Sequence, residues 1–168
     1  NPSEIVQHLA DMFNLDGEIT NDYYSDDSNV YVFTNGKVPS EPSVFMSWRG
    51  TGAWDVDFYE QGRSNKPHPF LSNEQLKAKA LEVFSKTGLN TTAEELEIYK
   101  DRGRRVVGAL SVEGQKTSLE WEIDWDERGN LQSVRGHSVE VVERGTFETI
   151  SEQAAIERID RKSTRLNS

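Results

Sequence analysis

The chain has 168 residues, no cysteine and a formal net charge of −10. The lack of cysteine excludes disulfide frameworks and thiol catalysis and disfavours a zinc site. The acidic balance argues against nucleic acid or an anionic membrane surface as partner, and no run of residues is apolar enough to span a bilayer.

A helix and three strands are predicted in the first part of the chain. We expect Ser3 to cap the helix and Gly17 to close it in a left-handed conformation. The apolar residues at helical spacing are Ile5, Leu9, Met12 and Phe13. Short segments rich in β-branched and aromatic residues predict strands at 30–34, 44–48 and 54–59.

Residues 61–71 contain Pro67, Pro69 and Gly62 among polar neighbours, a composition typical of an extended connector. A second helix is predicted after it, because Ser72 and Gln75 form a capping-box pattern. Its apolar stripe is expected to be Leu76, Ala80, Val83 and Phe84, with Gly88 closing the helix.

Four further strands are predicted at 96–100, 105–112, 119–125 and 131–142. Trp121 and Ile123 alternate with Glu120 and Glu122, which indicates a strand with one apolar face and one wet face. Hairpin turns are expected at 113–114 and 127–130, and a turn at 50–52 occupies the matching place in the first half.

A constant offset superposes the first helix on the second, including Gly17 on Gly88. We therefore predict an α+β fold of two repeated units, each with one helix packed on a curled antiparallel sheet. The expected divisions are a first unit at 1–60, a linker at 61–71, a second unit at 72–147, the start of a truncated helix at 148–159 and a tail at 160–168.

Both ends of the chain have the character of a fragment. Asn1 stands directly at a helix start without a preceding methionine. Residues 160–168 resemble the in-frame translation of a sequencing adapter, although a natural basic tail is the alternative. We expect that an anchor or signal segment precedes Asn1 in the full-length protein.

Acidic residues form the first candidate site. Alternate carboxylates on one predicted strand suit calcium by chemistry, but their spacing favours a solvated face: Glu120, Glu122, Asp124 and Asp126. A second acidic group lies in a segment of turn-forming composition, where a weak calcium site is the alternative to a turn: Asp22, Asp26 and Asp27.

The remaining candidates also have a structural interpretation that we favour. The histidines lack metal-ligand spacing and are expected at the surface: His8, His68 and His137. The tryptophans are expected in the core rather than in a sugar-binding groove: Trp48, Trp54, Trp121 and Trp125. One basic cluster predicts a solvated turn or, alternatively, a contact with an acidic peptide: Lys100, Arg102, Arg104 and Arg105. We predict no catalytic, cofactor-binding or metal-binding residue.

The order of elements resembles the extracytoplasmic regions of actinobacterial membrane-anchored proteins of unknown function. The resemblance is carried by residues 8–17, 52–56, 87–89, 119–134 and 149–155. The repeated unit is also similar to PepSY-type, YcdB-type and cystatin-like domains. This resemblance implies a module outside the membrane, attached through a helix that precedes it, with no catalytic residues.

We therefore expect a non-enzymatic extracytoplasmic interaction or sensing module that binds a protein or peptide, without a cofactor. The alternatives are a small-ligand-binding or enzymatic domain that uses a cavity between helix and sheet, and a structural spacer.

Overall fold

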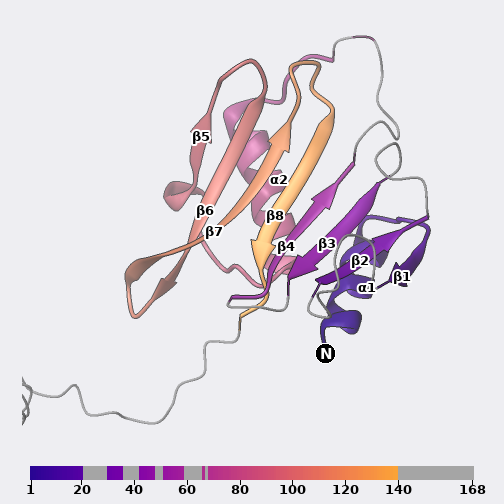
Figure 1. Cartoon of the computed structure of the whole chain (residues 1–168). Helices are drawn as coiled ribbons and strands as arrows, with labels where there is room; N and C mark the ends of the chain where they lie inside the picture. Colours follow the sequence, from indigo (N-terminus) through magenta and orange to yellow (C-terminus); the bar gives the residue numbers. More distant parts are fainter. Residues whose placement is uncertain (21–29, 36–41, 48–50, 59–65, 67, 140–168) are drawn as a thin grey trace, which may run out of the picture.

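The computed structural model describes residues 1–20, 30–35, 42–47, 51–58, 66 and 68–139 (Figure 1). Its helices are α1 (Pro2–Met12), α2 (Asn73–Lys86) and the short 3₁₀ helix η1 (Ala93–Glu95). Its strands are β1 (Glu18–Thr20), β2 (Val30–Thr34), β3 (Ser43–Ser47), β4 (Ala53–Asp57), β5 (Glu97–Tyr99), β6 (Arg104–Val112), β7 (Gln115–Trp125) and β8 (Leu131–His137).

All eight strands belong to one sheet, in the order β1-β2-β3-β4-β8-β7-β6-β5 (Figure 1). Every neighbouring pair is antiparallel. The predicted fold of two repeated helix-on-sheet units is therefore wrong. The fold is dominated by a single sheet that carries two short helices.

The two halves of the chain join where β4 pairs with β8. Val56 lies opposite Val134 and Asp55 lies opposite Arg135, across 80 residues of sequence. The alternation of apolar and polar residues in β4 shows which side chains are covered, but the same pattern fits a strand at the edge of one sheet or in the middle of a larger one. This is why the sequence pattern led to two sheets.

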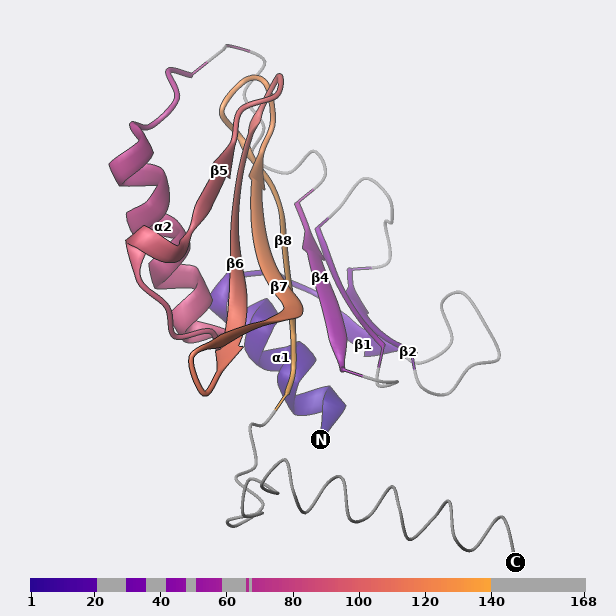
Figure 2. The same ribbon diagram turned by 90° about the vertical axis from the view of Figure 1, so that its left-hand side faces the viewer.

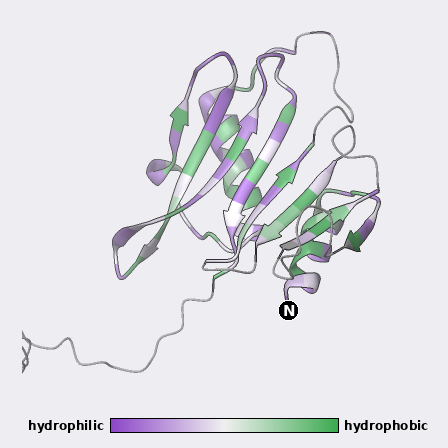
Figure 3. Cartoon of the chain, in the orientation of Figure 1, coloured by the Kyte–Doolittle hydropathy of each residue, from purple (hydrophilic) through white to green (hydrophobic). Residues whose placement is uncertain are grey.

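Both helices lie on the same side of the sheet (Figure 2). α1 packs on β2 and β3, while α2 packs on β6 and β7. We call this side the helix face and the other side the opposite face. Apolar and polar residues alternate along the strands (Figure 3), because successive side chains point to opposite faces. The core lies between the helix face and the helices.

Helix α1 differs in detail from its prediction. The side chain of Asn1, not of Ser3, caps it, by accepting a hydrogen bond from the backbone N of Ser3 at 3.1 Å. The helix ends at Met12, and the first residue with positive φ after it is Asn14, at 54°. Gly17 also has a positive φ, of 155°, but lies further from the helix end than predicted. Of the predicted stripe, Leu9 is buried, whereas Ile5, Met12 and Phe13 are only partly buried. The other buried residues of the helix are Val6 and Ala10.

Helix α2 matches its prediction. Ser72 and Gln75 form the reciprocal capping box, with N···O distances of 3.0 and 3.2 Å. The predicted stripe is the buried one, and Gly88 adopts a φ of +103° just after the helix. The hairpin turn predicted between β6 and β7 is also present, with positive φ at Glu113 and Gly114.

The main contacts of the two helices are with strands on either side of β4 and β8, which lie at the centre of the sheet. There the helix face is closed by Trp54 from β4 and Trp121 from β7, which are 4% and 1% exposed. Gly136 of β8 lies between them, and a Cβ atom on it would come within 2.5 Å of the Trp54 ring and 2.6 Å of the Trp121 ring. The indole N–H of Trp121 donates to the backbone O of Thr87 at the end of α2, at 3.4 Å.

Much of the predicted linker at 61–71, the predicted truncated helix at 148–159 and the tail at 160–168 lie outside the described residues. These divisions stay predictions.

We expect Gly136→Ala to destabilise the fold. The added methyl group would come within 2.6 Å of two buried indole rings, and overpacking of this kind costs about 1–3 kcal/mol. Urea unfolding followed by circular dichroism measures the change. Ser118→Ala, at an exposed position of β7, is the control and should leave the free energy of unfolding unchanged. A Gly136→Ala variant as stable as the wild type would contradict the packing described here.

Candidate functional site

The opposite face of the sheet is accessible over only part of its width. Val32 of β2 and Ser43 of β3 point to this face, and both are fully buried. Arg105 of β6, Glu120 of β7 and Arg135 of β8 are exposed. A candidate binding surface on this face therefore lies over β4, β8, β7 and β6.

This surface carries charged side chains from four neighbouring strands. We call the following set the acidic patch: Asp55 and Asp57 of β4, Arg135 of β8, Glu120, Glu122 and Asp124 of β7, and Arg105 of β6. The strand register places these residues on one face, because the buried residues between them, such as Val56 and Ile123, point to the helices. The set contains five carboxylates and two guanidinium groups, and Asp55, Glu122 and Asp124 form ion pairs with these guanidinium groups.

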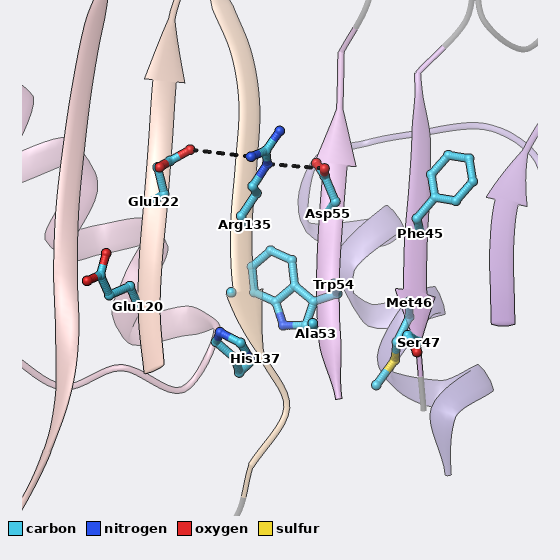
Figure 4. A pocket seen from close by; sticks show the side chains of 11 residues that line it. Phe45, Met46, Ser47, Ala53, Trp54, Asp55, Glu120, Glu122, Arg135 and His137 are labelled. Atoms are coloured by element: carbon cyan, nitrogen blue, oxygen red, sulfur yellow. Dashed lines mark hydrogen bonds and ion pairs between the residues drawn. The ribbon is translucent and has the colours of Figure 1, made fainter. Parts of the chain in front are cut away.

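Arg135 bridges two strands by weak contacts (Figure 4). Its Nε donates to Asp55 Oδ2 at 3.2 Å, and its Nη1 lies 3.9 Å from Glu122 Oε2, which is beyond hydrogen-bonding distance. The side chain of Arg135 is 58% exposed. The ion pairs therefore position Arg135 loosely, since exposed pairs of this kind contribute little free energy.

Arg105 makes closer contacts on the other side of β7. Its Nε donates to Asp124 Oδ1 at 2.7 Å and lies 3.4 Å from Glu122 Oε1. The hydroxyl of Ser133 donates to Asp124 Oδ2 at 3.2 Å. Both oxygens of Asp124 are therefore paired.

Two carboxylate oxygens in the patch are buried and accept no hydrogen bond from any described residue. They are Oδ1 of Asp55 and Oε2 of Glu122. A buried acceptor without a donor costs free energy, because the water that it gave up has not been replaced. The patch is thus short of hydrogen-bond donors.

The environment shifts the pKa of both carboxyl groups. Burial raises the pKa of Glu122 to about 7, helped by the neighbouring Asp124 and opposed by Arg105 and Arg135. Burial also raises the pKa of Asp55, against the opposing effect of Arg135. Both shifts have the direction expected for carboxyl groups that lose water without gaining full ion pairing.

A hollow of about 520 Å³ adjoins the part of the patch that contains Asp55, Glu122 and Arg135. Figure 4 shows side chains from β3, β4, β7 and β8 around it. Its charged and polar lining consists of Ser47, Asp55, Glu120, Glu122, Arg135 and His137, and Phe45, Ala53 and Trp54 are among its apolar lining residues. Its volume is within the range of small-molecule and side-chain binding sites.

His137 lies at the end of this hollow. Its Nδ1 is 2.8 Å from the hydroxyl of Thr51, and burial lowers its pKa. The ring also packs edge-on against Trp121, with 5.5 Å between the ring centroids. His137 thus lies between the hollow and Trp121 of the core.

The predicted carboxylate row on β7 takes three different roles. Glu120 is exposed, as expected of a solvated face, but Glu122 and Asp124 are partly buried and paired with arginines. Asp126 lies in the β7–β8 turn, where its Oδ1 accepts from the backbone N of Arg128 and of Asn130, both at 2.9 Å. The calcium alternative gains no support, because no metal-binding group of acidic or histidine side chains is found among the described residues. Asp22, Asp26 and Asp27 lie outside them.

The predicted tryptophan and histidine candidates differ in burial. Trp54, Trp121 and Trp125 are in the core as expected, and Trp48 is outside the described residues. His8 and His68 are exposed, whereas His137 is partly buried.

The four residues of the predicted basic cluster have different surroundings. Arg105 joins the acidic patch, and the guanidinium group of Arg104 lies 3.9 Å from the ring centroid of Phe70. Lys100 and Arg102 are exposed. A single basic surface for an acidic peptide is therefore not formed by these residues.

The sequence reasoning missed Asp55 and Arg135 as site residues. The only sequence signal was their place in alternating strands, next to Trp54 and Val134. Their pairing depends on the register between β4 and β8, and the alternation of apolar and polar residues does not predict this register.

No family model, curated protein or solved structure was found that matches this chain. Among the described residues, no helix is long and apolar enough to cross a membrane.

The raised pKa of Glu122 predicts a specific pH dependence of stability. The folded chain holds the proton of Glu122 more tightly than the unfolded chain, so this contribution is complete below pH 4.5 and is lost as the pH rises to about 7. The free energy of unfolding of the wild type, relative to Glu122→Gln, should therefore fall over this interval and stay level above it. Chemical unfolding of both proteins at a series of pH values measures the difference. A difference that does not change with pH would contradict the raised pKa.

Proposed function

We propose that this chain is a non-enzymatic interaction module and that its binding surface is the acidic patch with the adjoining hollow. The proposal is supported mainly by the two buried carboxylate oxygens that lack hydrogen-bond donors at the edge of an accessible hollow. A partner that supplies donors there would stabilise the patch. Charged groups on four strands also give the surface the width of a peptide or protein contact rather than of a single small ligand.

An extracytoplasmic location and attachment through a membrane anchor belong to the same proposal. They are supported by the sequence resemblance alone.

A small-ligand-binding or enzymatic domain that uses a cavity between helices and sheet is the second candidate. It is favoured by a separate hollow of about 280 Å³, whose lining includes Ile5, His8 and Leu9 of α1, Thr87 after α2, and Trp54. The volume lies at the lower limit of the about 300–1,000 Å³ of typical small-molecule sites. Ile5→Trp, which replaces a lining side chain by a larger indole ring, should abolish small-ligand binding if this is the site.

Selection from a random peptide library tests the proposed function. We expect the wild-type chain to enrich peptides whose binding is weakened at least about tenfold by Glu120→Lys, since one charge-assisted contact is replaced by a repulsion. Glu120 is exposed, so this variant should fold normally. Glu94→Lys is the matched control, because Glu94 is exposed in η1, next to α2 and away from the patch.

Binding would be measured for the individual peptides by fluorescence polarisation. Failure to enrich any peptide, or enriched peptides that bind both variants equally well, would overturn the proposal.

A further inference from the structure

The charge of the acidic patch indicates the charge of the ligand that it would bind. The patch contains five carboxylates and two guanidinium groups. Arg135 lies between Asp55 of β4 and Glu122 of β7, whereas Arg105 contacts Glu122 and Asp124, both on β7. Like charges held this close on one surface repel an acidic partner and attract a basic one. Charge complementarity therefore favours a cationic ligand.

The position of the two carboxylate oxygens that accept no hydrogen bond indicates which cationic group fits the site. Asp55 Oδ1 and Glu122 Oε2 belong to carboxylates on either side of β8, and Arg135 between them satisfies only Asp55 Oδ2 by a hydrogen bond. A guanidinium group carries five N–H donors in a planar fork and can donate to two carboxylates together, whereas an ammonium group acts as a compact point charge. The arrangement favours arginine over lysine.

The spacing of the carboxylates along β7 indicates the conformation of the ligand. Glu120, Glu122 and Asp124 occupy alternate positions of one strand, so their Cα atoms are separated by about 6.6 Å per step. An extended peptide has the same period between side chains on one of its faces. A segment with basic residues at alternate positions therefore matches the row.

We propose that the partner of this surface is an extended peptide segment with arginines at alternate positions, one of which enters the hollow and donates to Asp55 and Glu122 in place of Arg135. This inference rests on the function proposed above. Arg135 acts as a resident cation that occupies the site when the partner is absent. Its single hydrogen bond and its exposure allow it to move aside.

Binding should also depend on pH. The pKa of Glu122 is about 7, and the groups around it are Asp124 and Glu120 on β7, Arg105 on β6, Arg135 and Ser133 on β8, and Asp55 and Asp57 on β4. An incoming guanidinium group favours the ionised carboxylate, so binding releases a proton and becomes tighter as the pH rises through 7.

The test uses the full chain and isothermal titration calorimetry at low salt, at about pH 6 and about pH 8, which lie on either side of the pKa of Glu122. The probe is an acetylated and amidated pentapeptide of sequence Gly-Arg-Gly-Arg-Gly. Three analogues replace arginine by citrulline, which has the same shape without the charge, by lysine or by glutamate. We expect the arginine peptide to bind more tightly than the lysine peptide and to bind more tightly at about pH 8 than at about pH 6. The citrulline and glutamate peptides should not bind.

Two variants locate the contact. Glu122→Gln should weaken binding of the arginine peptide about tenfold and remove the pH dependence, since a charge-assisted hydrogen bond is lost. Arg135→Gln should tighten binding, because the resident cation is gone. Glu94→Gln and Lys79→Gln make the same charge changes at exposed positions of η1 and α2 and should leave the affinity nearly unchanged. If Glu122→Gln does not fold, Glu120→Gln, at an exposed position, should still weaken binding.

The inference would be overturned if the arginine and citrulline peptides behaved alike, if lysine served as well as arginine, or if Arg135→Gln changed the affinity no more than Lys79→Gln. If peptides without basic residues were selected from the library and still depended on Glu120, the proposed binding surface would stand and the arginine ligand would be excluded. If no peptide bound the surface at all, both proposals would fall together.

Discussion

The fold depends on a position that has no side chain. Gly136 lies on β8 at the centre of the sheet, and its bare α-carbon allows Trp54 and Trp121 to rest against the backbone from both sides. The two helices pack mainly on strands to either side of β4 and β8, and these indole rings are buried between the two regions. The same stretch of β8 positions Arg135 on the opposite face, one residue away. The core and the candidate site are therefore fixed by one short length of chain.

Local features of the fold were predictable from the sequence because their causes lie within a few residues. Ser72, Gln75 and Gly88 define α2 through hydrogen bonds and backbone conformations that neighbouring residues determine. The alternation around Trp121 correctly assigned the inner and outer faces of β7. In α1 the prediction was less accurate, since Ile5 and Val6 are both apolar and only packing against β2 and β3 decides which of them is buried.

Long-range features were not predictable in the same way. The pairing of β4 with β8 overturned the expected division into two sheets, because a strand with one apolar face carries no information about its neighbour. The contacts of the candidate site could not be predicted from the sequence for the same reason. Glu122 was visible as part of an acidic row, but its partners Arg105 and Arg135 come from other strands and are placed by register. In a row that the sequence predicted to be solvated, Glu122 and Asp124 are partly buried in the folded chain, and one oxygen of Glu122 accepts no hydrogen bond.

The strand order has a consequence for the way in which this chain is made. During synthesis β4 leaves the ribosome well before β8, which is its neighbour and lies about 80 residues later in the sequence. Throughout that interval β1 to β4 have an unprotected strand edge, which can pair with another nascent chain. Closing so distant a contact is also slow, since loop entropy must be overcome first. High expression rates should therefore favour aggregation of this protein, and slower translation or a chaperone that shields strand edges should favour its native form.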